Sequence, residues 1–275
     1  MLNDITLSSG MRSDLVQLQL VTALQSRTTE RLATGKRVNS AIDDPAAYFA
    51  SQDHLSHAAD LATRKSDIGE ALKTVNAANN GISAITALIQ QAKSLVTSAS
   101  SKTDTTSVTD LATQYDDLRT QIDNLATDSG YNGKNFLASG TLDVSFNEDG
   151  TSKLTITGFD GSSSGLAVTA ATGAWVSNNA IDQTKVAASL DELTAALTTL
   201  RTKAATLSSS NSIITARQDF ITSMINNLTA GANDLTAADP NEESANMLAL
   251  QTRQQLGVAT LGMANTAQQS ILRLF

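Results

Sequence analysis

The chain contains no cysteine among its 275 residues, which excludes disulfide scaffolds, thiolate metal sites and cysteine nucleophiles. Histidine occurs only at His54 and His57, and proline only at Pro45 and Pro240. The aromatic residues are six Phe, three Tyr and one Trp. So few large side chains favour long helices packed through small residues over a single thick globular core.

Positive charge is also scarce, since the net charge is -8 and the isoelectric point is about 4.7. Nucleic-acid binding is therefore not expected, because it needs a basic face. The sequence also lacks a basic amphipathic helix and any run of about 18 apolar residues, so no membrane contact is expected. Residues 1–9 have neither a cationic region nor an apolar core. A secreted chain of this kind would need export without a cleaved signal peptide.

Catalytic and metal-binding patterns are missing as well. His54 and His57 share a helix face at i, i+3, but no third histidine or carboxylate cluster accompanies them, so a solvated surface is the simpler interpretation. Asp116 and Asp117 are adjacent and project from different faces of a helix, which makes a poor acid–base pair. No phosphate-binding glycine loop, G-x-S-x-G or H-E-x-x-H occurs. The sequence predicts no enzyme activity and no cofactor.

The N-terminal half reads as helices. Residues 11–36 carry an apolar stripe at steps of three and four, and Gly35 is a plausible stop. Asp44 as a cap and Pro45 at the first position predict a second helix, which would run from Pro45 to about residue 100 and span roughly 80 Å. The stripe consists of Leu15, Leu18, Val21, Leu24, Thr28 and Leu32.

The middle of the chain changes character. Residues 97–109 are rich in Ser and Thr and predict a connector before a shorter helix that ends near Gly130. Alternating apolar residues around Asp149-Gly150 predict a β-hairpin within about residues 137–170. The glycine- and serine-rich residues 158–180 predict an exposed, loosely ordered loop in which Trp175 is a local packing anchor.

Helical periodicity returns over residues 182–235 and again after Asp239 and Pro240, which form a cap and first position. The last stripe predicts a coiled-coil seam. A single terminal helix of this kind is marginal in water, so we expect the two ends to pair and to gain stability from neighbouring subunits. The last stripe consists of Met247, Leu250, Gln254, Gly257, Leu261, Ala264, Gln268, Ile271 and Phe275.

Two long motifs at opposite ends carry a family resemblance. Residues 30–47 read ERLATGKRVNSAIDDPAA, and residues 245–256 and 264–272 read ANMLALQTRQQL and ANTAQQSIL. Both closely resemble the terminal signatures of bacterial flagellins, and Tyr131-Asn132-Gly133 before the hairpin resembles a third shared element. The resemblance covers about residues 10–160 and 185–275, without the large outer domains of many relatives.

The resemblance implies a mainly α fold: an elongated helical bundle with paired N- and C-terminal coiled-coil helices and a small β-hairpin region. It implies an inner domain of residues 1–42 with 236–275, and a rod-like domain of residues 43–235. The terminal helices are then expected to form the assembly interface of a filament. The residues expected to take part are Leu15, Leu18, Val21, Leu24, Arg31, Leu32, Met247, Leu250, Leu256, Leu261, Ile271, Leu272 and Phe275.

The resemblance also implies partners and a location outside the cell. These are further copies of the chain, an export chaperone on the C-terminal helix, junction and cap proteins, and export in an unfolded state through a flagellar type III apparatus. O-linked glycans are expected, if anywhere, at Ser162, Ser163 and Ser164. Recognition by an innate immune receptor is expected to be weak, because Gln91 stands where a basic residue is expected and Gln114 near where an acid is.

Two other interpretations remain open. A hook–filament junction protein shares the paired terminal helices and often has an Asp-Asp-Pro like that at residues 43–45. It would form an adaptor ring rather than a filament. An extracellular helical adhesin would use the hairpin and loop to bind a polymer, but Phe159 and Trp175 are few aromatics for such a surface.

Overall fold

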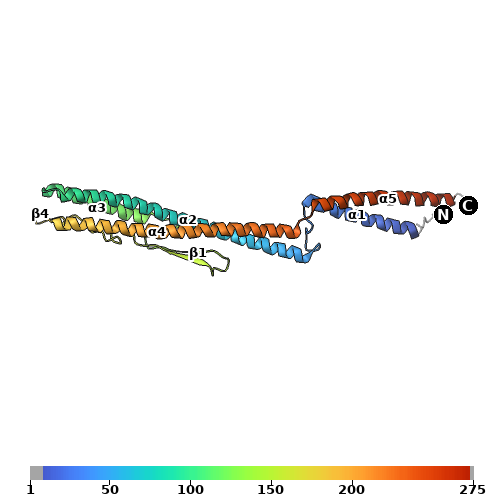
Figure 1. The fold of residues 1–275 in the computed structure, drawn as a ribbon, viewed down its shortest axis with the longest axis horizontal. Helices are drawn as coiled ribbons and strands as arrows, with labels where there is room; N and C mark the ends of the chain where they lie inside the picture. Colours follow the sequence, from blue (N-terminus) through green and yellow to red (C-terminus); the bar gives the residue numbers. More distant parts are fainter. Residues whose placement is uncertain (1–8, 273–275) are drawn as a thin grey trace, which may run out of the picture. The chain divides into compact units, whose positions relative to one another are not determined.

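The computed structural model describes the backbone of residues 9–272 and the side chains up to Ser270. This part of the chain is mainly helical, with two small antiparallel sheets (Figure 1). The predicted fold class is therefore confirmed. The helices are α1 Ser9–Thr34, α2 Pro45–Ser100, α3 Thr105–Asp128, α4 Gln183–Thr236 and α5 Pro240–Leu272, and the strands are β1 Thr141–Ser145, β2 Lys153–Thr157, β3 Val176–Ser177 and β4 Ala180–Ile181.

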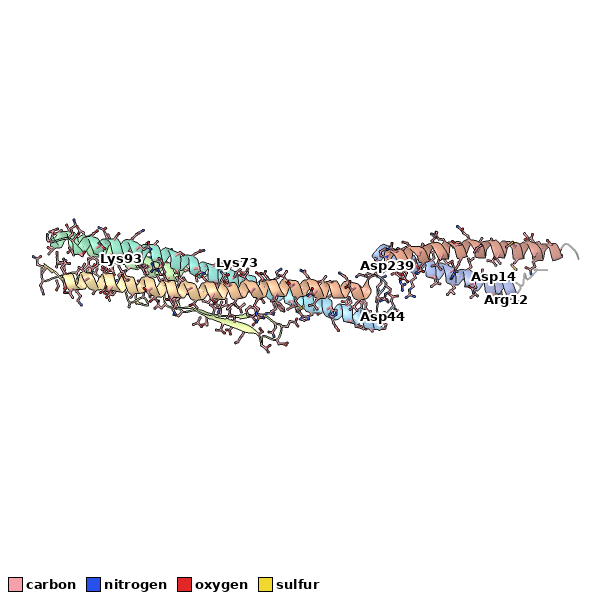
Figure 2. All side chains as sticks on the ribbon, viewed as in Figure 1. Arg12, Asp14, Asp44, Lys73, Lys93 and Asp239 are labelled. Atoms are coloured by element: carbon pink, nitrogen blue, oxygen red, sulfur yellow. The ribbon has the colours of Figure 1, made fainter. Side chains whose placement is uncertain are left out.

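The ends of the helices follow the predicted capping residues. Gly35 takes φ of +67° directly after α1, a conformation that favours glycine. Asp44 Oδ1 accepts a hydrogen bond from the Ala47 N–H at 3.1 Å, and Asp239 Oδ1 accepts one from the Asn241 N–H at 2.8 Å. Figure 2 labels the two aspartates. Each aspartate satisfies a backbone donor that the first turn of its helix leaves free.

The predicted connector over residues 97–109 is wrong in extent. Helix α2 continues to Ser100, and α3 already begins at Thr105, with the Asp104 carboxylate accepting the Ser107 N–H at 2.8 Å. The Thr97 and Thr109 hydroxyls donate to backbone carbonyls four residues earlier in their own helices. Hydroxyl side chains satisfied in this way are compatible with a helix, so composition alone misplaced the boundary.

The chain divides into two compact units. Unit 1 comprises the described residues within Met1–His57 and Asn227–Phe275, and unit 2 comprises Ala58–Asn226. The expected domain boundaries, near residues 42 and 236, lie closer to the chain ends. The Ser51 hydroxyl donates to the Ala232 carbonyl at 3.0 Å, which ties the start of α2 to the end of α4 within unit 1.

Unit 2 is built on α2 and α4, which lie side by side and are bridged by a hydrogen bond of 2.9 Å from Asn211 to Asn76. Each helix buries one large apolar residue every seven positions, the period of left-handed coiled coils. Alanine occupies four of five buried positions in a second seven-residue series of α2, which allows close packing; the series is Ala71, Ala78, Ile85, Ala92 and Ala99. The buried series are Leu61, Ile68, Val75, Ile82, Ile89 and Val96 in α2, and Val186, Leu193, Leu200, Leu207, Ile214 and Ile221 in α4.

The predicted hairpin is confirmed. Strand β1 pairs antiparallel with β2, so that Leu142 lies opposite Ile156 and Val144 opposite Leu154. Val144 and Ile156 are buried, while Asp143 and Thr155, which precede them in their strands, are exposed. Gly150 supplies positive φ in the turn, as the sequence indicated.

Residues 158–180 differ from the expected loose loop. Trp175 is fully buried, its ring centroid lies 5.0 Å from that of Tyr115, and its Nε1–H donates to the Ser189 hydroxyl at 2.9 Å. Leu166 and Val168 are buried as well. Trp175 is thus the packing anchor that the sequence predicted, but the segment around it is packed rather than exposed throughout.

Carboxylates of the helices hold this segment by its backbone. Asp116 of α3 accepts the Ala171 N–H at 3.0 Å and the Thr172 N–H at 2.9 Å. Burial raises the pKa of Asp116, but the Thr172 hydroxyl, these two N–H groups and the Arg119 charge outweigh it and hold the pKa below the ordinary 3.8. The charged carboxylate therefore stabilises the packed segment.

This arrangement predicts acid sensitivity. Because the folded pKa is lowered, the stabilisation is complete above the unfolded pKa and is lost as the pH falls through the folded pKa. We expect Asp116→Asn to lower the midpoint of urea unfolding at pH 7, monitored by Trp175 fluorescence, and to flatten its dependence on pH below about 4. Asp117→Asn is the matched control on the exposed neighbouring position. Equal pH profiles for Asp116→Asn and the unsubstituted chain would contradict the assignment.

Candidate assembly surface on the terminal helices

Helices α1 and α5 of unit 1 lie side by side and run antiparallel (Figure 1). Arg31, near the end of α1, contacts Glu243, near the start of α5. Leu18, nearer the start of α1, lies against Gly257, where an added Cβ would meet Leu18 Cδ1 at 3.3 Å. The absence of a side chain at Gly257 leaves room for Leu18 in the seam.

The covered face of α5 is the stripe predicted from its spacing. Leu250 is 8% exposed, and the other members that the structure describes are half-buried, while their neighbours are exposed. Glu243 extends the same row by one step toward the start of the helix. The half-buried members are Met247, Gln254, Gly257, Leu261, Ala264 and Gln268.

The predicted stripe of α1 is only partly the covered face. Leu15, Leu24 and Leu32 are 42, 39 and 36% exposed and lie beside the seam rather than in it. Polar residues at steps of three and four complete the seam, and a search for apolar periodicity cannot detect them. The covered or half-buried residues of α1 are Met11, Asp14, Leu18, Val21, Gln25, Thr28 and Arg31.

An ion pair lies at the inner end of the seam. Arg31 Nη1 and Glu243 Oε1 are 2.9 Å apart, and their side chains are 22 and 7% exposed. Arg31 Nε is buried and has no hydrogen-bond partner among the described residues. An ion pair at this depth adds little net stability, and we expect it to disfavour other alignments of the two helices.

Large apolar side chains remain exposed on both helices. Val16 and Leu20 of α1 are 63 and 57% exposed, and Leu248, Leu256 and Met263 of α5 are 66, 63 and 65% exposed. These side chains are concentrated on two helices instead of being scattered singly over the surface. Exposed apolar patches of this kind mark interaction surfaces. Val16, Leu20 and Leu24 follow one another at steps of four, a signal in the sequence that the single-stripe interpretation missed.

The thirteen expected assembly residues therefore fall into groups. The covered seam contains Leu18, Val21, Arg31, Met247, Leu250 and Leu261, and the exposed positions beside it are Leu15, Leu24, Leu32 and Leu256. The side chains of Ile271 and Leu272, and all of Phe275, lie outside the described residues. Their part in contacts between copies stays a prediction.

Backbone hydrogen bonds join the two connectors at the base of this helix pair. The Arg37 N–H donates to the Thr236 carbonyl at 2.7 Å, and the Ala238 N–H donates to the Gly35 carbonyl at 3.0 Å. Nearby, the Ser40 N–H and then the Asn39 N–H hold the pKa of Asp43 below its ordinary value.

The other candidate positions give no chemistry. Within residues 9–272, no group of three or more His, Cys, Asp or Glu residues could hold a metal ion. No helix in this described part is long and apolar enough to cross a membrane. Ser163 is only 2% exposed, and its hydroxyl donates to Asp123 Oδ2 at 3.0 Å. Ser163 is therefore a poor glycan acceptor, and Ser162 and Ser164 remain the accessible candidates.

Comparisons with known proteins agree with these features. Residues 6–141 match the bacterial flagellin N-terminal helical region, and residues 190–275 match the bacterial flagellin C-terminal helical region. Flagellin C of Rhizobium meliloti (strain 1021) is 60% identical over 38 residues, which are 14% of this chain and 12% of that protein. A flagellin of Brucella melitensis biotype 1 is 60% identical over 38 residues, 14% of each chain.

Those matches span only a small share of either relative. A crystal structure of Bacillus cereus flagellin aligns with a TM-score of 0.48 and 17% identity, covering 56% of this chain and 88% of that one. The two family regions, by contrast, together cover most of the sequence at both ends. The chain therefore belongs to the bacterial flagellin family.

Proposed function

We propose that the chain is a structural subunit that polymerises with copies of itself into a flagellar filament for swimming motility. The observation that carries the proposal is the exposed apolar surface on both helices of the α1–α5 pair, beside a seam that is already covered. Burial of such surface against neighbouring copies stabilises an otherwise marginal pair of helices.

The proposed layers follow the earlier domain expectation. Residues 1–42 and 236–275 form the inner contacts, and residues 43–235 form the next layer, with the hairpin and residues 158–180 toward solvent. The assembled subunit lies outside the cell and reaches it by export in an unfolded state. The apolar positions of α5 would be covered before assembly by an export chaperone, and filament ends would contact junction and cap proteins.

Weak recognition by an innate immune receptor is part of the same proposal. Gln91 of α2 and Gln114 of α3 line one shallow surface of unit 2, together with Asp117. The neutral amides at these two positions offer no strong charge to a partner, since amide contacts are weaker than ionic ones. A strong response in a receptor reporter assay would contradict this expectation.

The decisive experiment is assembly of the purified chain. Monomers obtained by heating are cooled with short filament seeds and followed by sedimentation and electron microscopy. We expect long tubular filaments from the unsubstituted chain. We expect Val16→Ser combined with Leu20→Ser to assemble poorly while circular dichroism shows unchanged helix content in unit 2.

The same experiment separates the alternatives. A chain that stays monomeric despite seeds, or stops at short rings, would favour the junction-protein interpretation. A monomer that binds a surface polymer through the hairpin would favour an adhesin.

A further inference from the structure

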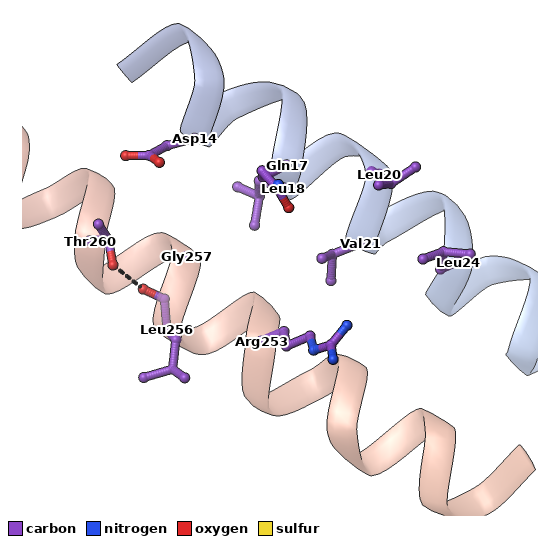
Figure 3. Close-up of a pocket in the computed structure, with 10 residues that line it drawn as sticks. All are labelled: Asp14, Gln17, Leu18, Leu20, Val21, Leu24, Arg253, Leu256, Gly257 and Thr260. Carbon is purple, nitrogen blue, oxygen red and sulfur yellow. Dashed lines mark hydrogen bonds between the residues drawn. The ribbon is translucent and has the colours of Figure 1, made fainter. Parts of the chain in front are cut away.

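One side of the α1–α5 pair carries a continuous groove with two chemically different halves. Two adjoining cavities of about 280 and 290 Å³ share Leu24 and Arg253 as lining residues, and we call their union the Arg253 groove. Figure 3 shows the outer half, in which Arg253 of α5 projects between the helices toward Val21 of α1. Apolar side chains, Leu18, Leu20, Val21, Leu24 and Leu256, dominate this half.

The inner half is cationic. Arg27, Arg31 and Arg253 line it, and Glu243 is its one carboxylate. Glu243 is engaged by Arg31 at 2.9 Å. Arg27 Nη2 lies 3.6 Å from Asp43 Oδ1, and Asp43 itself is not among the residues that line this half.

One buried donor in this half lacks an acceptor, because Arg31 Nε is buried without a hydrogen-bond partner among the described residues. Arg253 beside it is exposed and forms no ion pair or side-chain hydrogen bond within the part of the chain that the structure describes. Buried donors are nearly always paired in folded proteins, so an unpaired one requires an explanation. A carboxylate between Arg31 and Arg253 would supply the missing acceptor, and guanidinium groups suit carboxylates in geometry as well as charge.

The apolar half restricts what could bring that carboxylate. A small free anion would leave Leu20, Leu24 and Leu256 exposed. A helix that presents apolar side chains next to an acidic one would cover both halves, as in helix-in-groove recognition. Copies of this chain have suitable chemistry, because the chain has a net charge of -8, while the groove is lined by three arginines against two carboxylates. These charged lining residues are Arg27, Arg31, Arg253, Asp14 and Glu243.

We propose that the Arg253 groove receives a helix of a second copy, with apolar side chains against Leu20, Leu24 and Leu256 and a carboxylate between Arg31 and Arg253. The inference rests on the proposed function and specifies one of its contacts. The contact is heterologous, since a groove on one copy accepts a different surface on the next, and such contacts build open helical assemblies. A charge at a fixed place also sets the register, which apolar contacts alone specify weakly.

The test compares two charge reversals in the full-length chain. Arg253→Glu places a carboxylate in the groove, and Arg201→Glu makes the same change on an exposed position of α4. The critical concentration for elongation is measured by sedimentation with filament seeds of the unsubstituted chain. We expect Arg253→Glu to raise it by about tenfold or more and Arg201→Glu to leave it within about twofold.

Arg253→Gln is the control for a folding defect, because glutamine has a helix propensity similar to that of arginine and the substitution removes the positive charge without adding a negative one. We expect it to raise the critical concentration by an intermediate factor, and added salt to raise that of the unsubstituted chain more than that of Arg253→Gln. Normal elongation of both Arg253 variants, or equal effects at positions 253 and 201, would overturn the groove contact while leaving filament formation intact. Failure of the unsubstituted chain to elongate would instead reject the proposed function.

Discussion

Replacing Trp175 with alanine is expected to destabilise unit 2 by about 3–5 kcal/mol, the range for deleting a large buried aromatic side chain. Trp175 is completely buried against Tyr115 and connects residues 158–180 to α4 through Ser189. Its loss opens a cavity and also leaves the Ser189 hydroxyl with one fewer partner. Urea unfolding followed by circular dichroism measures the change, because α2, α3 and α4 contribute most of the signal.

Trp175→Phe is the matched control. It keeps an aromatic ring near Tyr115 but removes the Nε1–H donor, so a smaller loss of about 1–2 kcal/mol is expected. A Trp175→Ala loss below about 1 kcal/mol would mean that residues 158–180 are not integrated with the helical core.

The second large effect is expected at the ion pair of the terminal helices. Glu243→Ala leaves the Arg31 guanidinium, only 22% exposed, without its carboxylate. Breaking a buried pair from one side costs about 3–5 kcal/mol. Because Thr28 and Leu250 are the other buried residues among the described parts of α1 and α5, we expect this change to abolish most of their protection against amide hydrogen exchange.

Replacing both partners provides the control. Arg31→Met together with Glu243→Leu removes both charges, and we expect it to restore exchange protection to at least the original level. We also expect the doubly substituted chain to assemble into less uniform filaments, because the charge that distinguishes one alignment from another has gone. Uniform filaments from this variant would show that register is set elsewhere.

The sequence predicted some parts of the assembly surface better than others for identifiable reasons. In α5 the covered row from Met247 to Gln268 follows a single strict spacing, so periodicity located it. In α1 the apolar residues occupy more than one face, and polar Asp14, Gln25 and Thr28 fill the seam. A search for apolar spacing therefore merged seam residues with exposed ones such as Leu15.

Residues 158–180 show a different limit. Their glycine and serine content is typical of a loose loop, yet distant carboxylates bind their backbone N–H groups. Asp123 accepts the Ser163 N–H at 2.6 Å, and Glu192 accepts the Thr169 N–H at 2.9 Å. These carboxylates lie tens of residues away in the chain, so the composition of residues 158–180 cannot predict the hydrogen bonds that they form.

The hydrogen-bonded connectors at the base of α1 and α5 also bear on how the chain ends come together. Since Arg37 with Thr236 and Gly35 with Ala238 already hold the two backbones, the helices can pair outward from Arg31 and Glu243, and each further contact closes only a short loop. A tethered partner acts at an effective concentration in the millimolar range for short linkers. A terminal helix from another copy must compete with that concentration, so each subunit is expected to retain its own helix pair and to meet its neighbours as an intact two-helix unit.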